Sequence, residues 1–181
     1  MLMNRAQAPQ RLHNLFFAFL PPAEVSARIL GQLSDYGVGL DTMRRDRLHI
    51  TILSLVCYGA IPAGLIEQAA EAAANVRAEP VPVKFERLIA AEKSAFLAPG
   101  ESLDALRMFR EKLGFTLMRD GVDLKLVGRF SPHVTVAYDP AQHFNEELPE
   151  SVIWTADEFV LVDSHVGETR HDIVGRWRLG G

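Results

Sequence analysis

Several features that assign a protein to a function class are scarce or missing in this sequence. It has a single cysteine, Cys57. This excludes a disulfide within the chain and a zinc site built from cysteines, and it fits a reducing compartment, so we expect the cytoplasm. No segment approaches the ~18 apolar residues of a membrane-spanning helix. The apolar run at 15–20 stops at Pro21 and Pro22, short of the ~7–15 apolar residues of a signal peptide.

Charge and glycine content exclude further classes. A net charge of −4 argues against a protein that coats nucleic acid through bulk electrostatics, although a small site for an RNA end needs only a few local cations. No Walker or Rossmann glycine pattern is present, so we expect no nucleotide cofactor. Residues 163–165, Asp-Ser-His, are serine-hydrolase residue types, but no Gly-x-Ser-x-Gly elbow surrounds the serine.

The chain contains enough apolar residues to build a single domain. At 181 residues, 48% of them hydrophobic and 23% charged, it suits one domain over 1–181, with 1–11 as a flexible tail. Hydrophobic periodicity predicts the element order β-α-β-α-β-β-α-β-β-β, which is typical of an α+β fold rather than a repeating βαβ array. Each half contains one distinctive strand and at least one helix, which favours two similar lobes that face each other.

The two distinctive strands carry the same polar pair. Residues 49–52 read His-Ile-Thr-Ile and residues 133–136 read His-Val-Thr-Val, at a separation of 133 − 49 = 84 residues. Because residues i and i+2 of a strand share a face, each histidine lies on the same face as its own threonine, while the β-branched residues point into a core. A single His-x-Thr is common by chance in a core or surface strand. Its repetition in similar contexts favours a functional role.

Two such pairs suit acid–base chemistry on a phosphodiester. Histidine titrates near neutrality, so His49 and His133 can serve as base and acid in one turnover, each role being worth roughly 10²–10⁴ in rate. The hydroxyls of Thr51 and Thr135 can stabilise charge on phosphate oxygens. This chemistry needs no metal. A zinc site built on the same histidines is disfavoured, because no His-x-His or His-Glu-x-x-His spacing occurs and threonine is a poor zinc ligand.

These motifs resemble those of the two-histidine (2H) phosphoesterases, and within them the RNA 2',3'-cyclic phosphodiesterases that are also described as 2'-5' RNA ligases. The resemblance extends from residues 15–19 to residues 177–179. Its most specific part is 129–137, Arg-Phe-Ser-Pro-His-Val-Thr-Val-Ala, which looks like the second family motif. Residues 47–52 resemble the first motif, and 161–164 resemble the penultimate strand.

The resemblance implies a bilobal fold, with two antiparallel-sheet lobes around a central groove and helices outside. It implies that His49 donates a proton to the leaving 2' oxygen, that His133 activates water, and that Arg129 binds phosphate beside it. The implied reaction opens a 2',3'-cyclic phosphate to a 2'-phosphate without a cofactor, and its reverse would join RNA ends by a 2'-5' link. The expected partners are RNA ends or small cyclic nucleotides, bound by a monomer that does not enter a membrane.

One alternative function stays open. A non-catalytic module could bind nucleotides or RNA ends in the same groove without turnover. The roles of four further residues are also open at this stage. Arg44 and Arg45 form either a solvated charge cluster or a steering patch, and His165 and His171 fall in a predicted surface loop.

Overall fold

The computed structural model describes residues 11–36, 47–101, 103–124 and 129–181. Most of the predicted tail, and both Arg44 and Arg45, lie outside these residues. The described residues form an α+β fold in which one antiparallel sheet has the strand order β6-β3-β4-β5-β2-β1-β7-β8. None of the described helices is long and apolar enough to cross a membrane.

Helices and strands alternate irregularly along the chain. The helical elements are α1 (Ala23–Leu33), the 3₁₀ turn η1 (Ser34–Tyr36), α2 (Leu65–Ala73) and α3 (Asp104–Arg119). The strands are β1 (His13–Phe19), β2 (Ile50–Gly59), β3 (Val81–Ala90), β4 (Ser94–Ala98), β5 (Val134–Tyr138), β6 (Phe144–Ala156), β7 (Glu158–His165) and β8 (Arg170–Arg178).

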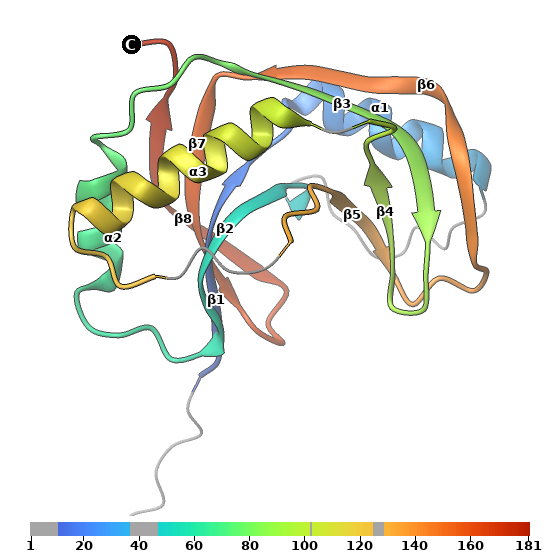
Figure 1. Cartoon of the computed structure of the whole chain (residues 1–181). Coiled ribbons are helices and arrows are strands. Elements are labelled where there is room, and N and C mark those ends of the chain that lie inside the picture. The colour runs from blue at the N-terminus through green and yellow to red at the C-terminus, as the bar shows by residue number, and fades with distance from the viewer. Residues whose placement is uncertain (1–10, 37–46, 102, 125–128) are drawn as a thin grey trace, which may run out of the picture.

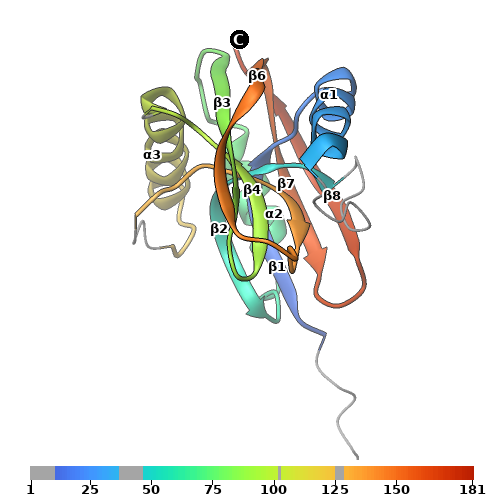
Figure 2. The ribbon, with the colours of Figure 1, turned by 90° about the vertical axis from the view of Figure 1, so that its right-hand side faces the viewer.

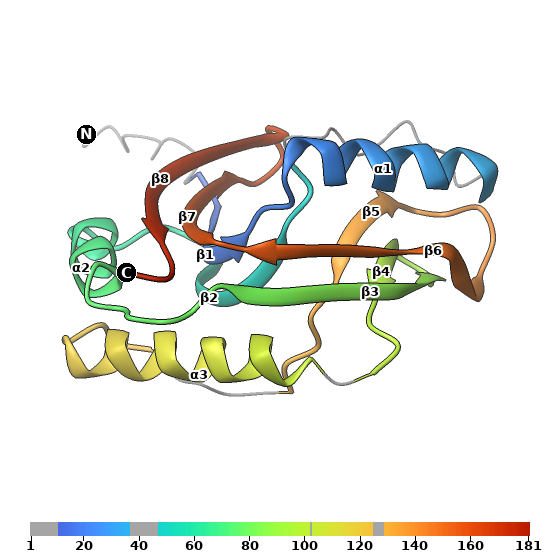
Figure 3. The same ribbon diagram turned by 90° about the horizontal axis from the view of Figure 1, so that it is seen from above.

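The sheet consists of two four-stranded halves that meet at a narrow junction. Strands β2 and β5 pair antiparallel through Ile50 and Val134, the only residue pair recorded between them in the described chain. Figure 1 shows the sheet bent into an arch, with the β3–β4 turn and the β7–β8 turn both on its lower side. Figures 2 and 3 show α1 and α3 on opposite sides of β3 and β6. The predicted bilobal α+β architecture is confirmed.

Local sequence explains the first two elements. Strand β1 lies between β2 and β7 inside the sheet, and it is apolar on both faces because each face packs against other apolar residues. Leu15, Phe17 and Phe19 enter the main core, while Phe16 and Ala18 join a smaller cluster on the other face. The two prolines then end the strand, and the amide of Ser26 donates to the carbonyl of Pro22 to begin α1.

The predicted order of elements is correct except for one missing strand. The sequence analysis placed no strand between β5 and β7, whereas β6 occupies Phe144–Ala156. This strand lies at the edge of the sheet, and its first half places three glutamates and a proline within residues 144–150. Pro149 falls within a register shift opposite Phe85–Arg87, where a proline costs no ladder hydrogen bond. Edge strands tolerate charge and proline, so the usual strand signals were weak here.

Candidate active site

The two repeated motifs are neighbours at the centre of the sheet. His49 and His133 each directly precede the first residue of their strand, β2 and β5 respectively. The pair Ile50–Val134 joins equivalent positions of the two motifs. Extending this antiparallel register by one residue in each direction sets each histidine across from the threonine of the other motif. The sheet therefore brings together the four side chains that the sequence separates by 84 positions.

The same kind of hydrogen bond holds each histidine in place. The Nδ1 of His49 lies 2.7 Å from the carbonyl oxygen of Arg47, and the Nδ1 of His133 lies 2.9 Å from that of Ser131. A carbonyl oxygen only accepts, so Nδ1 must carry the proton in each ring. In the neutral form Nε2 then has a free lone pair, which is the arrangement that a general base needs.

An aromatic ring from the adjoining strand supports each histidine. Phe16 of β1 stacks on His49 with ring centroids 4.9 Å apart, and Phe96 of β4 meets His133 edge-on at 5.4 Å. The two half-sites thus share a carbonyl behind the imidazole and a phenylalanine beside it. This repetition extends the symmetry of the motifs to their surroundings.

The two half-sites differ in burial and charge. His49 is partly buried beneath Phe16, whereas His133 is exposed. His171 of β8 also contacts the His49 ring edge-on, at 5.5 Å between centroids. Burial, followed by repulsion from His171, His133 and Arg47, lowers the pKa of His49 from 6.5 to about 4. His49 is therefore neutral at neutral pH in the empty groove.

A groove of about 420 Å³ opens in front of these residues. This volume is in the range of small-molecule sites. Both motif histidines and both motif threonines line it. Among the described residues that line it none is aspartate or glutamate, while Arg47 contributes a guanidinium group. A groove lined by imidazole, hydroxyl and guanidinium groups attracts an anion and places donors around it.

The structure places Arg129 outside this groove. Arg129 is exposed and lines a separate hollow together with Arg107 and Phe130. Its predicted contact with phosphate stays a prediction. The cation that lines the groove is Arg47, which the sequence analysis treated only as part of the first motif. The Nε of Arg47 is buried without a hydrogen-bond partner among the described residues. The sequence signal for this role was its position two residues before the first histidine.

Further residues line the groove: Asn14, for which the sequence left a ligand contact and a turn or cap role open, Tyr138, which was not predicted, and two histidines that were placed wrongly. Asn14 lines the groove and accepts a hydrogen bond from the amide of Tyr58 at 2.7 Å, which fixes the end of β2. Tyr138 lines it from the end of β5. The expected surface loop at His165 and His171 is wrong, because these residues belong to β7 and β8, are partly buried, and both line the groove.

The lowered pKa of His49 predicts a loss of stability in acid. Between pH 6.5 and about 4 the unfolded chain binds a proton at His49 that the folded chain does not. The free energy of unfolding therefore falls as pH decreases through this window. At about 1.4 kcal/mol per pH unit, the loss reaches about 3 kcal/mol.

Urea unfolding at several values between pH 7 and pH 4 measures this loss. His49→Gln should flatten the pH dependence relative to the wild type, whereas a matched change at the exposed His143 should leave it intact. An equally steep loss in His49→Gln and in the wild type would contradict the assignment of the acid sensitivity to His49.

Comparison with known families assigns most of the chain. The family model described as the 2'-5' RNA ligase superfamily matches residues 21–168. This range contains both repeated motifs and the groove residues that belong to them. No curated protein sequence matches the chain.

Solved structures share the fold over nearly the full length. Escherichia coli LigT in complex with 3'-AMP is 21% identical, with a TM-score of 0.76, over 94% of this chain and 99% of that chain. A structure described as a phosphoesterase gives 21% identity and a TM-score of 0.76, over 96% and 100%. Protein TT0787 of Thermus thermophilus is 20% identical, with a TM-score of 0.65, over 93% of this chain and 98% of that chain. At these identities the likeness shows the fold alone.

Proposed function

Because the chain belongs to the 2'-5' RNA ligase superfamily of two-histidine phosphoesterases, we propose that it opens 2',3'-cyclic phosphates of RNA ends or small nucleotides to 2'-phosphates. Family membership makes it an enzyme of the phosphoesterase or ligase type. The observation that carries the finer proposal is the pair of histidines, each with Nδ1 bound to a carbonyl and Nε2 left for proton transfer.

The proposed step is an in-line displacement at phosphorus. His133 takes a proton from water through Nε2 as the water oxygen bonds to phosphorus. The bond between phosphorus and the 3' oxygen breaks, and His49 gives that oxygen a proton. Atom balance corrects one expectation: a 2'-phosphate product requires the 3' oxygen to leave, not the 2' oxygen. A 5' hydroxyl in place of water would give a 2'-5' linkage by the same step.

The difference in burial between the histidines supports this division of roles. The exposed His133 can meet water. His49 is neutral in the empty groove, because burial and the neighbouring cations lower its pKa. A cyclic phosphate is a monoanion, and an anion beside His49 favours the charged imidazolium. The proposed role of His49 as the acid therefore requires that the bound anion raise its pKa far enough to protonate the ring.

The other groove residues suit the charge that develops on the phosphate. Thr51 and Thr135 place hydroxyl groups in the groove, and Arg47 places a cation there. Donors aimed at a developing oxyanion lower the barrier because they need little reorganisation during the reaction. Arg129, which lines the separate hollow, remains a proposed phosphate contact. No step of this mechanism uses a metal.

The E. coli LigT structures support a nucleotide as the ligand. That protein was crystallised with 3'-AMP, with ATP and with NADP+. By analogy we propose that the groove of this chain takes one terminal nucleotide. A non-catalytic binding module would use the same groove. However, a binder has little need for two imidazoles with free Nε2 atoms, so the enzyme is favoured.

A product assay separates the two functions. Purified protein is incubated with 2',3'-cyclic AMP and 2',3'-cyclic CMP in excess EDTA, and the products are resolved by phosphorus NMR. We expect the 2'-phosphate, at a rate that EDTA does not change. Binding without product would support the module, and loss of turnover on addition of EDTA would contradict the mechanism. Adding an oligonucleotide with a free 5' hydroxyl tests for 2'-5' ligation.

A further inference from the structure

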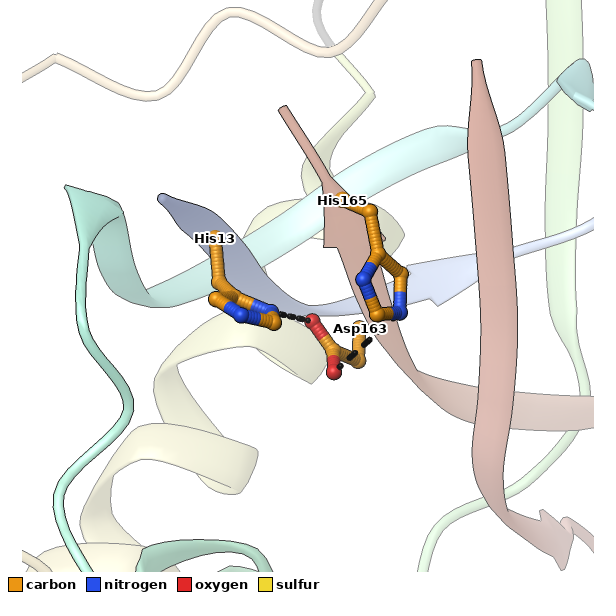
Figure 4. Close-up of side chains that lie close together, drawn as sticks. All are labelled: His13, Asp163 and His165. Atoms are coloured by element: carbon orange, nitrogen blue, oxygen red, sulfur yellow. Dashed lines mark hydrogen bonds and ion pairs between the residues drawn. The ribbon is translucent and has the colours of Figure 1, made fainter. Parts of the chain in front are cut away.

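A second group of titratable side chains lies outside the catalytic machinery, at one end of the sheet. His13, Asp163 and His165 present ring nitrogen and carboxylate oxygen atoms that all lie within 4.8 Å of one another. The Nδ1 of His13 is 2.7 Å from Oδ1 of Asp163, and the Nε2 of His165 is 3.7 Å from Oδ2. Figure 4 shows both imidazoles directed toward the same carboxylate.

The sheet register places these residues together. His13 of β1 pairs with His165 of β7, and Asp163 lies two residues before His165 on the same face. Asp163 in turn pairs with Asp172 of β8. Three adjacent strands thus contribute to the group: β1 supplies His13, β7 supplies Asp163 and His165, and β8 supplies Asp172. The His13 and His165 rings lie 4.9 Å apart between centroids, so the group is compact.

Two of the three residues, His13 and Asp163, lie on the face of the sheet away from the catalytic groove, whereas His165 reaches one end of it. Leu15 and Leu161, which are two residues from His13 and from Asp163 on the same face, belong to the main core. The alternate residues Asn14 and Ser164 line the groove, whereas His13 and Asp163 do not. His165 lines one end of the groove while its ring nitrogen points to the carboxylates. The acid–base mechanism therefore leaves the cluster without a role.

The donor set fits a transition-metal cation. Two imidazole nitrogens and a carboxylate oxygen are the ligands that Zn²⁺ takes in sites with three protein ligands. With Zn²⁺ about 2.0–2.1 Å from each ligand, tetrahedral ligand atoms lie about 3.3 Å apart, and the distances of 2.7 and 3.7 Å bracket that value. Oδ2 of Asp172 lies 2.9 Å from Nε2 of His165 and 2.6 Å from Nη2 of Arg170, so this carboxylate can supply a fourth oxygen once it gives up part of its ion pair with Arg170. Mg²⁺ and Ca²⁺ prefer all-oxygen sites.

The surroundings of His165 support coordination through Nε2. Its Nδ1 is buried and has no hydrogen-bond partner among the described residues. If Nε2 binds a cation, Nδ1 carries the ring proton, and the carboxylate of Glu168 lies 4.0 Å away. At 4.0 Å this carboxylate makes no hydrogen bond to Nδ1, and a side-chain rotation of Glu168 would bring it into the position from which a carboxylate orients a metal-bound imidazole.

We propose that His13, Asp163 and His165, with Asp172 as the fourth ligand, form a binding site for a divalent cation of the Zn²⁺ type. The cation ties β1 to β7 and β8 and stabilises this end of the sheet. The site is structural and takes no part in the opening of the cyclic phosphate. It is therefore independent of the proposed function, and it predicts that a metal changes stability and leaves the chemistry unchanged.

Calorimetric titration of the metal-free full chain with ZnCl₂ tests the site. We expect one Zn²⁺ per chain. His13→Gln should weaken binding by more than about 100-fold, which exceeds the cost of losing a partner that only orients a ligand. The matched changes His143→Gln and His133→Gln, at an exposed position and in the groove, should leave the affinity unchanged. Absence of binding, or equal affinity in His13→Gln, would overturn the proposal.

X-ray absorption at the zinc edge supplies a second test that needs no variant. The expected spectrum has only nitrogen and oxygen ligands, with the scattering pattern of two imidazoles. A sulfur ligand would assign the ion to Cys57 in the groove and would overturn the proposal. In thermal unfolding, Zn²⁺ should raise the midpoint of the wild type and of His143→Gln, and should not raise that of His165→Gln.

Discussion

Replacing either His49 or His133 by alanine is expected to slow the opening of a 2',3'-cyclic phosphate by roughly 10²–10⁴-fold. In the proposed mechanism each change removes one Nε2 that transfers a proton, while the threonines and Arg47 remain to hold the phosphate. The fall should therefore appear in kcat, with a smaller effect on KM. Because the two imidazoles act as a pair, the double variant should be little slower than the slower single variant.

Steady-state kinetics across a pH series provides the measurement. The wild type should give a bell-shaped profile, since one ring must be neutral while the other is charged. Each single variant should lose one limb of that profile, which a merely structural change would not cause. His143→Ala is the matched control, because His143 is exposed and does not line the groove. Full activity in either catalytic variant would rule out the acid–base pair.

The largest expected effect on stability is at Phe159. This residue of β7 is completely buried and packs against the rings of Phe17, Phe109 and Trp177, with centroids 6.0, 5.3 and 5.2 Å away. It thereby joins β1, α3 and β8 around β7. Phe159→Ala should lower the free energy of unfolding by about 3–5 kcal/mol, because it removes apolar contacts and leaves a cavity among rigid rings.

Urea unfolding measures this loss, and an m-value equal to that of the wild type would show that only the stability has changed. Ile153→Ala on β6 is the control, since Ile153 is 53% exposed and should cost no more than about 0.5 kcal/mol. A loss at Phe159 no larger than that at Ile153 would show that the aromatic cluster does not determine stability. At temperatures where Phe159→Ala stays folded, its turnover should match the wild type.

Local patterns were sufficient for most of the fold. The apolar stripe of α1 and the alternation of β3 depend only on neighbours along the chain, so periodicity identified them. Strand β6 was missed because an edge strand buries little and tolerates charge and Pro149. The same limit explains the misplaced loop: His165 and His171 read as polar surface residues, and only pairing with neighbouring strands shows them at the ends of β7 and β8.

The sequence by itself identified the side chains that we propose carry the chemistry. The His-x-Thr spacing is local, and an i, i+2 pair on a strand shares a face in any fold. The tertiary structure alone decided how the two copies differ. Phe16 and His171 reach His49 from β1 and β8, and their presence with burial lowers its pKa to about 4, while His133 stays exposed. Desolvation and charge depend on what surrounds a residue in space, so the local His-x-Thr pattern could not show that His49 would differ from His133 in its surroundings.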